Sequence, residues 1–180
     1  YLYMQTEVTS QFDILPDFVT QKSLNAVQSS PGILMEFDGR DNIFTPDKGT
    51  FVHADFRVNA DWTGSDFDYQ NLHLYMYQYI PFTSNWIGGF RFDMQQQFDN
   101  APFYMLPGIS LRGVPVARYQ GTQTYILETE QRYDFNLRWS GVVFGGTAKA
   151  LDNETFQDAK WIYNYGVGFR YLLARLFKLR

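Results

Sequence analysis

Apolar and polar side chains alternate along Tyr125-Ile126-Leu127-Glu128-Thr129-Glu130-Gln131-Arg132-Tyr133-Asp134-Phe135-Asn136-Leu137-Arg138-Trp139. Successive side chains of a strand point to opposite faces, so this period of two predicts an extended strand. One face carries Tyr125, Leu127, Tyr133, Phe135, Leu137 and Trp139, and the other carries Glu128, Glu130, Arg132, Asp134, Asn136 and Arg138. The pattern therefore predicts a strand that separates an apolar environment from an aqueous one.

The same alternation recurs along the chain, and no stretch has a convincing helical period. Between residues 51 and 62, for example, Val52, Ala54 and Phe56 alternate with His53, Asp55 and Arg57. We count about eight strands, over residues 1–9, 33–40, 51–62, 69–80, 85–98, 122–139, 142–150 and 162–177. The sequence thus predicts an all-β fold of antiparallel strands.

The connections between these strands alternate in length. Long polar segments follow the first, third, fifth and seventh strands, the first of them over residues 10–30, and tight turns follow the others, the last at Ser140-Gly141. Outer-membrane barrels have short turns on one side and longer extracellular loops on the other. Most of the strands also reach the roughly 9–11 residues that a tilted strand needs to cross a bilayer. We therefore predict a transmembrane β-barrel with its long loops outside.

Composition narrows the classes of function. Aromatic residues make up 19% of the 180 residues, which suits strands and membrane interfaces. The net charge of −4 argues against a nucleic-acid partner. The chain has no cysteine, which rules out disulfides and thiolate metal sites. No apolar run approaches the roughly 18 residues of a membrane-spanning helix, but a barrel hides its apolar half at every second position.

Four further stretches carry motifs in a fixed order. They are Asp38-Gly39-Arg40-Asp41-Asn42-Ile43-Phe44-Thr45-Pro46-Asp47-Lys48-Gly49, Leu111-Arg112-Gly113 followed by Arg118-Tyr119, Glu130-Gln131-Arg132-Tyr133, and Tyr165-Gly166-Val167-Gly168-Phe169-Arg170-Tyr171. They resemble the D-x-R-(D/N)…P-x-x-G turn, the (V/I/L)-R-G-(F/Y) loop, the E-L-(R/E)-F strand and the Y-x-x-G-x-G-(F/L)-R penultimate strand of one family. That family comprises the BamA/TamA-type outer-membrane assembly factors and the two-partner-secretion transporters, also called bacterial surface antigen barrels.

The resemblance implies a site. In such proteins the loop arginine folds back into the lumen and pairs with a carboxylate of the inner wall. Carried over, Leu111, Arg112, Gly113, Arg118 and Tyr119 form the loop motif, with Glu130 as the partner of Arg112 and Glu128 beside it. A guanidinium fork on a carboxylate makes specific, charge-assisted bonds in a partly dried lumen. The turn motif comprises Asp38, Arg40, Asp41, Pro46 and Gly49.

Two departures from the family pattern concern its acidic site and its final strand. The next strand of the family carries an acidic F-x-D-x-G site, whereas Phe144-Gly145-Gly146-Thr147 has no carboxylate. The family barrel ends in a strand with a terminal aromatic residue, whereas this sequence ends at Leu179-Arg180, so it either lacks the final strand or closes in another way. We expect one barrel domain over residues 1–180 and no periplasmic domain. Eight strands can close alone, or two chains can share a larger barrel.

The sequence leaves more than one function open. The preferred hypothesis is a bacterial outer-membrane barrel, in contact with lipopolysaccharide or phospholipid, whose Arg112 loop gates the passage or insertion of polypeptide or lipid. One alternative is a structural or adhesive barrel that transports nothing, and another is a soluble lipocalin-like ligand-binding barrel. His53 and His73 fall on polar faces, where lumen hydrogen bonding is favoured over a metal site with Asp55. We expect no enzymatic activity and no cofactor.

Overall fold

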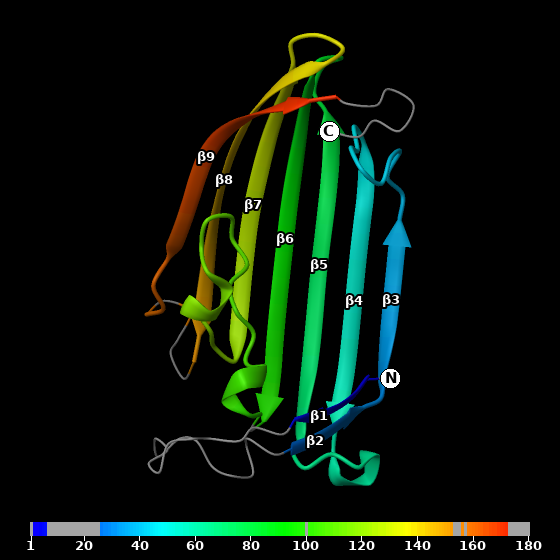
Figure 1. Ribbon diagram of the computed structural model, residues 1–180, viewed down its shortest axis with the longest axis vertical. Coiled ribbons are helices and arrows are strands. Elements are labelled where there is room, and N and C mark those ends of the chain that lie inside the picture. Colours follow the sequence, from blue (N-terminus) through cyan, green and yellow to red (C-terminus); the bar gives the residue numbers. More distant parts are fainter. Residues whose placement is uncertain (1, 7–25, 100, 153–155, 157, 173–180) are drawn as a thin grey trace.

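The computed structural model describes residues 2–6, 26–99, 101–152, 156 and 158–172. Its main element is a seven-stranded antiparallel sheet with the strands in chain order (Figure 1). The strands are β3 (Gly32–Asp38), β4 (Gly49–Asn59), β5 (Tyr69–Pro81), β6 (Trp86–Asp99), β7 (Gln123–Asp134), β8 (Trp139–Leu151) and β9 (Ile162–Tyr171). The expected all-β antiparallel fold is confirmed. No helix in the described part of the chain is long and apolar enough to cross a membrane.

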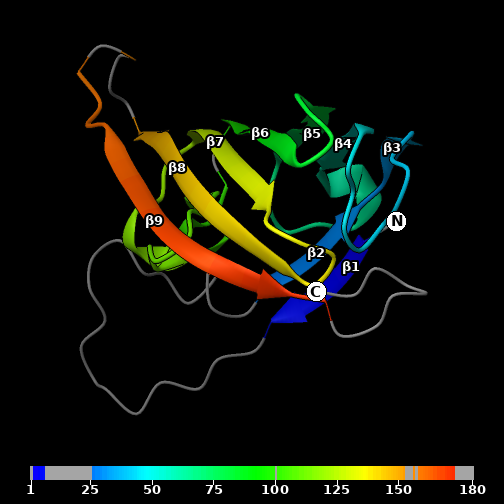
Figure 2. The same cartoon turned by 90° about the horizontal axis from the view of Figure 1, so that it is seen from above.

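The sheet is strongly curved, and seen from above it forms an open crescent from β3 to β9 (Figure 2). Within the described residues, β3 and β9 each have only one hydrogen-bonded neighbour. The segments 39–48, 82–85 and 135–138 connect the strands at one end, which we call the turn end. At the opposite end, the loop end, the connections are 60–68, 100–122 and 152–161. The loop end therefore holds the longest connection of the sheet.

Cross-strand register divides the side chains into two faces, because directly paired residues lie on the same face. Leu127 pairs with Phe92 and Thr147 on the convex face, whereas Glu128 pairs with Arg91 and Gly146 on the concave face. Convex side chains are exposed: 54% of Leu127 and 75% of Phe169, for example. Concave ions are covered, with Asp93 at 6% and Arg132 at 4%. The apolar and polar residues that alternate in the sequence thus lie on the convex and the concave face of the sheet, respectively.

The turn between β7 and β8 lies earlier than expected. Strand β7 ends at Asp134, and β8 already begins at Trp139, so the expected strand end at Trp139 and the expected turn at Ser140-Gly141 are wrong. Asn136 is the physical reason. Its Oδ1 accepts hydrogen bonds of 2.9 Å from the backbone N–H groups of Arg138 and Trp139, which closes a local turn.

A two-stranded hairpin, β1 (Leu2–Thr6) and β2 (Ala26–Ser30), lies within the curve of the sheet (Figure 2). Strand β2 falls inside the segment expected to be a plain connection. Tertiary hydrogen bonds hold it: the Val27 N–H donates to Asp66 Oδ2 at 2.7 Å, and Tyr69 Oη donates to Gln28 Oε1 at 2.9 Å. Parts of the expected first and last strands, residues 7–9 and 173–177, lie outside the described residues.

Strand β4 is shorter than expected. It ends at Asn59 and is followed by a 3-10 turn, η1 (Asp61–Thr63). Trp62, which the alternation placed in the strand, lies in this turn and is 77% exposed.

Candidate functional site

The connection 100–122 folds back onto the concave face of β7 and β8 (Figure 1). It contains two short 3-10 turns, η2 (Phe103–Met105) and η3 (Val116–Arg118), and a bridge between Gly108 and Gln120 closes it on itself. Ile109 and Leu111 are 0% and 4% exposed. They form an apolar cluster with Ile126, Ala148, Val114, Tyr119, Ala150 and Ile162. Apolar burial therefore attaches the loop to the sheet.

Arg112 follows this cluster and reaches the inner wall. Its Nη2 lies 2.6 Å from Glu130 Oε2, and its Nε lies 4.0 Å from Glu128 Oε1. The guanidinium also lies 4.6 Å from the ring centroid of Phe144, within cation–π range. Phe144 belongs to the stretch Phe144-Gly145-Gly146-Thr147, which has no carboxylate, so an aromatic ring and not a further acid lies beside Arg112 from this strand. The Arg112 side chain remains 49% exposed, so this ion pair borders water.

The backbone around Arg112 is fixed as well. Gly113 has φ +79°, in the left-handed region that favours glycine, and the Val114 N–H donates to the Leu111 carbonyl at 3.1 Å. Arg91 Nη1 donates to the Ser110 carbonyl at 2.9 Å, and Asn164 Nδ2 donates to the Arg112 carbonyl at 3.2 Å. Side chains of β6 and β9 therefore hold the loop from both sides.

The two glutamates of β7 are shared among several donors. Arg91 Nη1 lies 3.0 Å from Glu128 Oε2, and Arg91 Nη2 lies 2.6 Å from Asp93 Oδ2. Glu130 contacts Arg170 of β9 in addition to Arg112. A cavity of about 430 Å³ lies among these groups. Ser110, Leu111, Arg112, Glu128, Glu130, Arg132, Arg170, Tyr77 and Tyr79 line it, among others.

Sequence reasoning missed Arg91 and Arg170 as members of this network. The register contained a usable signal, because Arg91 stands directly opposite Glu128 on the neighbouring strand. Arg170 is two strands away from Glu130, and only the curvature of the sheet brings their side chains together.

Arg118 and Tyr119 lie apart from the ionic network. The Arg118 guanidinium is 5.5 Å from the ring centroid of Tyr119, and the Arg118 side chain is exposed. Among the described residues it forms no ion pair with a carboxylate. Tyr119 instead contributes its side chain to the apolar cluster beneath the loop.

The turn motif is assembled at the opposite end of the sheet. Asp38 and Arg40 form an ion pair with 2.7 Å between Oδ2 and Nη2, and this hydrogen-bonded carboxylate raises the pKa of Arg40. Asp41 Oδ1 accepts hydrogen bonds from the backbone N–H groups of Asp47 and Lys48 at 2.9 and 3.2 Å. Gly49 has φ +110°, and Pro46 contributes its carbonyl to a contact with β7 described below.

His53 and His73 are neighbours on the concave face, with their ring centroids 6.0 Å apart. Each faces its own carboxylate: His53 Nδ1 lies 3.4 Å from Glu36, and His73 Nε2 lies 3.1 Å from Asp93. Asp55 is paired with Arg57 at 2.6 Å. No group of three histidine or carboxylate side chains in the described residues is placed to hold a metal ion.

The fold of the sheet matches a known architecture. A solved structure of BamA from Haemophilus ducreyi lacking POTRA domains 1-3 superposes with a TM-score of 0.69 over 82% of the chain. The chain has the fold of a BamA-type barrel. Sequence identity to that structure is 14%, and the chain spans 37% of its length. No protein-family model and no curated protein sequence matches the chain.

Proposed function

We propose that this chain is part of a bacterial outer-membrane barrel whose lumen is gated by the loop 100–122. The gate controls passage or insertion of polypeptide or lipid, and the chain performs no chemistry of its own. The contact of Arg112 with Glu130 and Glu128 carries the proposal, because it places the tip of a long connection on the inner wall. The BamA-type fold is the setting in which such a loop has a lumen to close.

The distribution of aromatic side chains on the convex face supports its contact with lipid. Aromatic side chains gather at both of its ends. The turn end has Phe82, Trp86, Tyr133, Phe135, Trp139, Phe169 and Tyr171, and the loop end has Tyr125, Phe156, Trp161 and Tyr163. Between Tyr125 and Tyr133 a strand rises about 26 Å at roughly 3.3 Å per residue. A tilted strand spans somewhat less along the membrane normal, close to the apolar band of about 25 Å in outer-membrane barrels.

Lys149 is the one charged side chain that register places on the convex face of the described sheet. It is 2% exposed, and its Nζ lies 4.2 Å from the ring centroid of Phe156 and 4.3 Å from that of Trp161. These rings, from the connection 152–161, cover the ammonium group. Shielding of the ammonium group by these rings is consistent with a surface in contact with lipid, where an exposed charge is energetically costly.

The concave face argues against a soluble ligand-binding barrel. A lipocalin-like protein keeps an apolar interior for its ligand and a polar exterior. Here Asp93, Arg132 and Glu128 lie inside, while Leu127, Val167 and Phe169 are 54%, 80% and 75% exposed outside. A protein with this distribution requires detergent to remain dispersed. A stable monomer in detergent-free buffer would contradict the membrane assignment.

Conductance across a planar bilayer tests the gate. Arg112→Ala removes the ion pair with Glu130 and is expected to raise the conductance of the purified protein severalfold. Arg118→Ala is the matched control, since it removes an exposed arginine of the same loop whose guanidinium lies near the Tyr119 ring and, among the described residues, forms no ion pair with a carboxylate. Its conductance should equal that of the parent. If Arg112→Ala conducts no better than the parent, the gate is refuted and a plugged structural barrel is favoured.

A further inference from the structure

The turn 39–48 does not project away from the sheet. It connects β3 to β4, yet it contacts β7, three strands away, across a distance of about 14 Å at roughly 4.8 Å per strand. Phe44 and Pro46 line the same cavity as Arg112, together with Tyr79 and Ile87 of the intervening strands. Thr45 is 1% exposed. The turn therefore lies over the concave face and covers it from the turn end.

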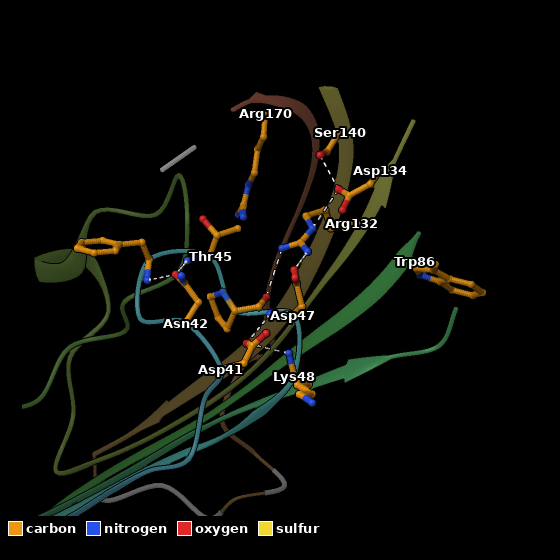
Figure 3. Close-up of polar contacts among 12 residues, drawn as sticks. Asp41, Asn42, Thr45, Asp47, Lys48, Trp86, Arg132, Asp134, Ser140 and Arg170 are labelled. Carbon is orange, nitrogen blue, oxygen red and sulfur yellow. Dashed lines mark hydrogen bonds and ion pairs between the residues drawn. The ribbon is translucent and has the colours of Figure 1, made fainter. Parts of the chain in front are cut away.

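One buried arginine attaches the turn to the wall. Arg132 of β7 contacts the Asp47 carboxylate through Nη2 and donates to the Pro46 carbonyl through Nη1 at 3.3 Å. Its Nε lies 3.3 Å from Asp134 Oδ1, and Ser140 Oγ donates to the same oxygen at 2.5 Å. The Arg132 side chain is 5% exposed. Figure 3 shows Asp47 and Arg132 pointing toward one another.

The turn has internal hydrogen bonds that present Asp47 to Arg132. Asn42 Oδ1 accepts hydrogen bonds of 2.8 Å from the N–H groups of Phe44 and Thr45, while Asp41 Oδ1 accepts from those of Asp47 and Lys48 (Figure 3). The Asp41 N–H donates to the Lys48 carbonyl at 3.1 Å. The turn is thus a preformed unit that docks as a whole.

We propose that the turn 39–48 is a second closure of the lumen, independent of the loop 100–122 and entering from the opposite end. The two closures meet on consecutive concave positions of β7, the loop on Glu130 and the turn on Arg132. The inference rests on the proposed function, because a lumen that conducts nothing needs no closure. The inference also predicts that release of the loop alone leaves the turn end of the lumen covered.

Thiol labelling can follow the two closures separately, because the chain has no cysteine of its own. Thr45→Cys reports on the turn, and Ala148→Cys, 1% exposed beneath the loop, reports on the loop. A hydrophilic maleimide is applied to the protein in lipid vesicles. Both thiols should react slowly in the otherwise unchanged protein, since both side chains are buried.

Asp47→Asn removes the charge that Arg132 binds. It should raise the labelling rate of Thr45→Cys by roughly two to four orders of magnitude, the size expected when a buried ion pair loses a partner, and leave that of Ala148→Cys unchanged. Arg112→Ala should raise the labelling rate of Ala148→Cys by up to about fivefold, because its ion pair is half exposed, and leave that of Thr45→Cys unchanged. Asp55→Asn is the control, because Asp55 forms an ion pair with Arg57 at 2.6 Å elsewhere on the concave face. It should change neither rate.

The outcomes separate this proposal from the proposed function. If Asp47→Asn leaves Thr45→Cys unreactive while Arg112→Ala raises conductance, the second closure is refuted and the gate stands. If both thiols respond to both substitutions while Asp55→Asn changes neither rate, the two closures open as one unit and their independence is refuted. If Asp47→Asn exposes only Thr45→Cys but Arg112→Ala leaves conductance unchanged, the turn is a separate cover and the gate is refuted.

Discussion

The loop 100–122 and the turn 39–48 both reach β7, but different forces hold them there. The loop buries Ile109 and Leu111, and its ion pair through Arg112 is half exposed. The turn relies on Arg132, a buried arginine set between Asp47 and Asp134. The free energy of apolar packing is lost in proportion to the area that is uncovered, so it can be given up in small steps, whereas a buried ion without its partner carries one large penalty. We therefore expect the loop to detach in small steps. The turn should either keep its ion pair with Arg132 or detach completely.

Removal of Arg132 is expected to have the largest effect. Arg132→Met should lower the free energy of unfolding by about 3–5 kcal/mol, because Asp47 and Asp134 lose their shared counter-ion. Urea unfolding followed by tryptophan fluorescence measures it. Arg138→Ala, at an exposed arginine of the turn 135–138, should change the free energy by less than about 0.5 kcal/mol. Equal losses of unfolding free energy in the two variants would contradict the expectation that the buried arginine contributes more to stability than the exposed one.

The apolar attachment of the loop should come next. Ile109→Ala truncates a fully buried side chain that the loop contributes to the cluster and should cost about 2 kcal/mol, near the low end for such truncations because a loop can settle. Proteolysis within the residues 100–122 should become faster. Val116→Ala, in the same loop but 53% exposed, is the control and should leave cleavage unchanged. A faster cleavage in both variants would mean that the cluster does not hold the loop.

Gly113 allows a sharper comparison within the loop, because a methyl group at Gly113 or at Gly168 would meet no atom within 4 Å. Of these two glycines, only Gly113 has a positive φ, +79°. Gly113→Ala should therefore cost about 1 kcal/mol in backbone strain, and Gly168→Ala should cost nearly nothing. Thermal unfolding of the two variants measures the difference. Indistinguishable midpoints would show that the loop backbone relaxes freely around this residue.

The smallest effect on stability is expected for Arg112→Ala, about 1 kcal/mol or less, because the side chain is half exposed. The same substitution should have the largest effect on conductance. Stability and gating would then be governed by different residues of β7 and its partners. A loss of several kcal/mol in the unfolding measurement would instead make Arg112 a structural anchor like Arg132.

The sequence predicted most of the strands because each strand separates a charged face from an apolar one, and this contrast is written at every second residue. It failed where no such contrast exists. Strand β2, Ala26–Ser30, has no alternating pattern and is held by Asp66, Asn59 and Tyr69. The alternation also continued through Phe135 and Leu137, although Asn136 turns the chain there.

The site was predictable only in part. The resemblance to surface antigen barrels pointed to Arg112, Glu130, the loop motif and the turn motif. In the structure Arg112 lies beside Glu130. The contact between Asp47 and Arg132 had no sequence signal, since the two residues are 85 positions apart and the intervening strands must first curve. Long-range ion pairs of this kind follow from the shape of the sheet rather than from local pattern.

The double pairing of Glu130 has an electrostatic consequence for opening. Arg112 reaches this carboxylate from the loop that withdraws in the proposed gate, whereas Arg170 reaches it from β9, which is part of the sheet. When the loop leaves, the carboxylate keeps one cation beside it. Glu130 is then not left as an unpaired carboxylate, so withdrawal of the loop costs its apolar contacts, the half-exposed ion pair of Arg112 and the hydrogen bonds from Arg91 and Asn164, without the larger penalty of a stranded buried charge.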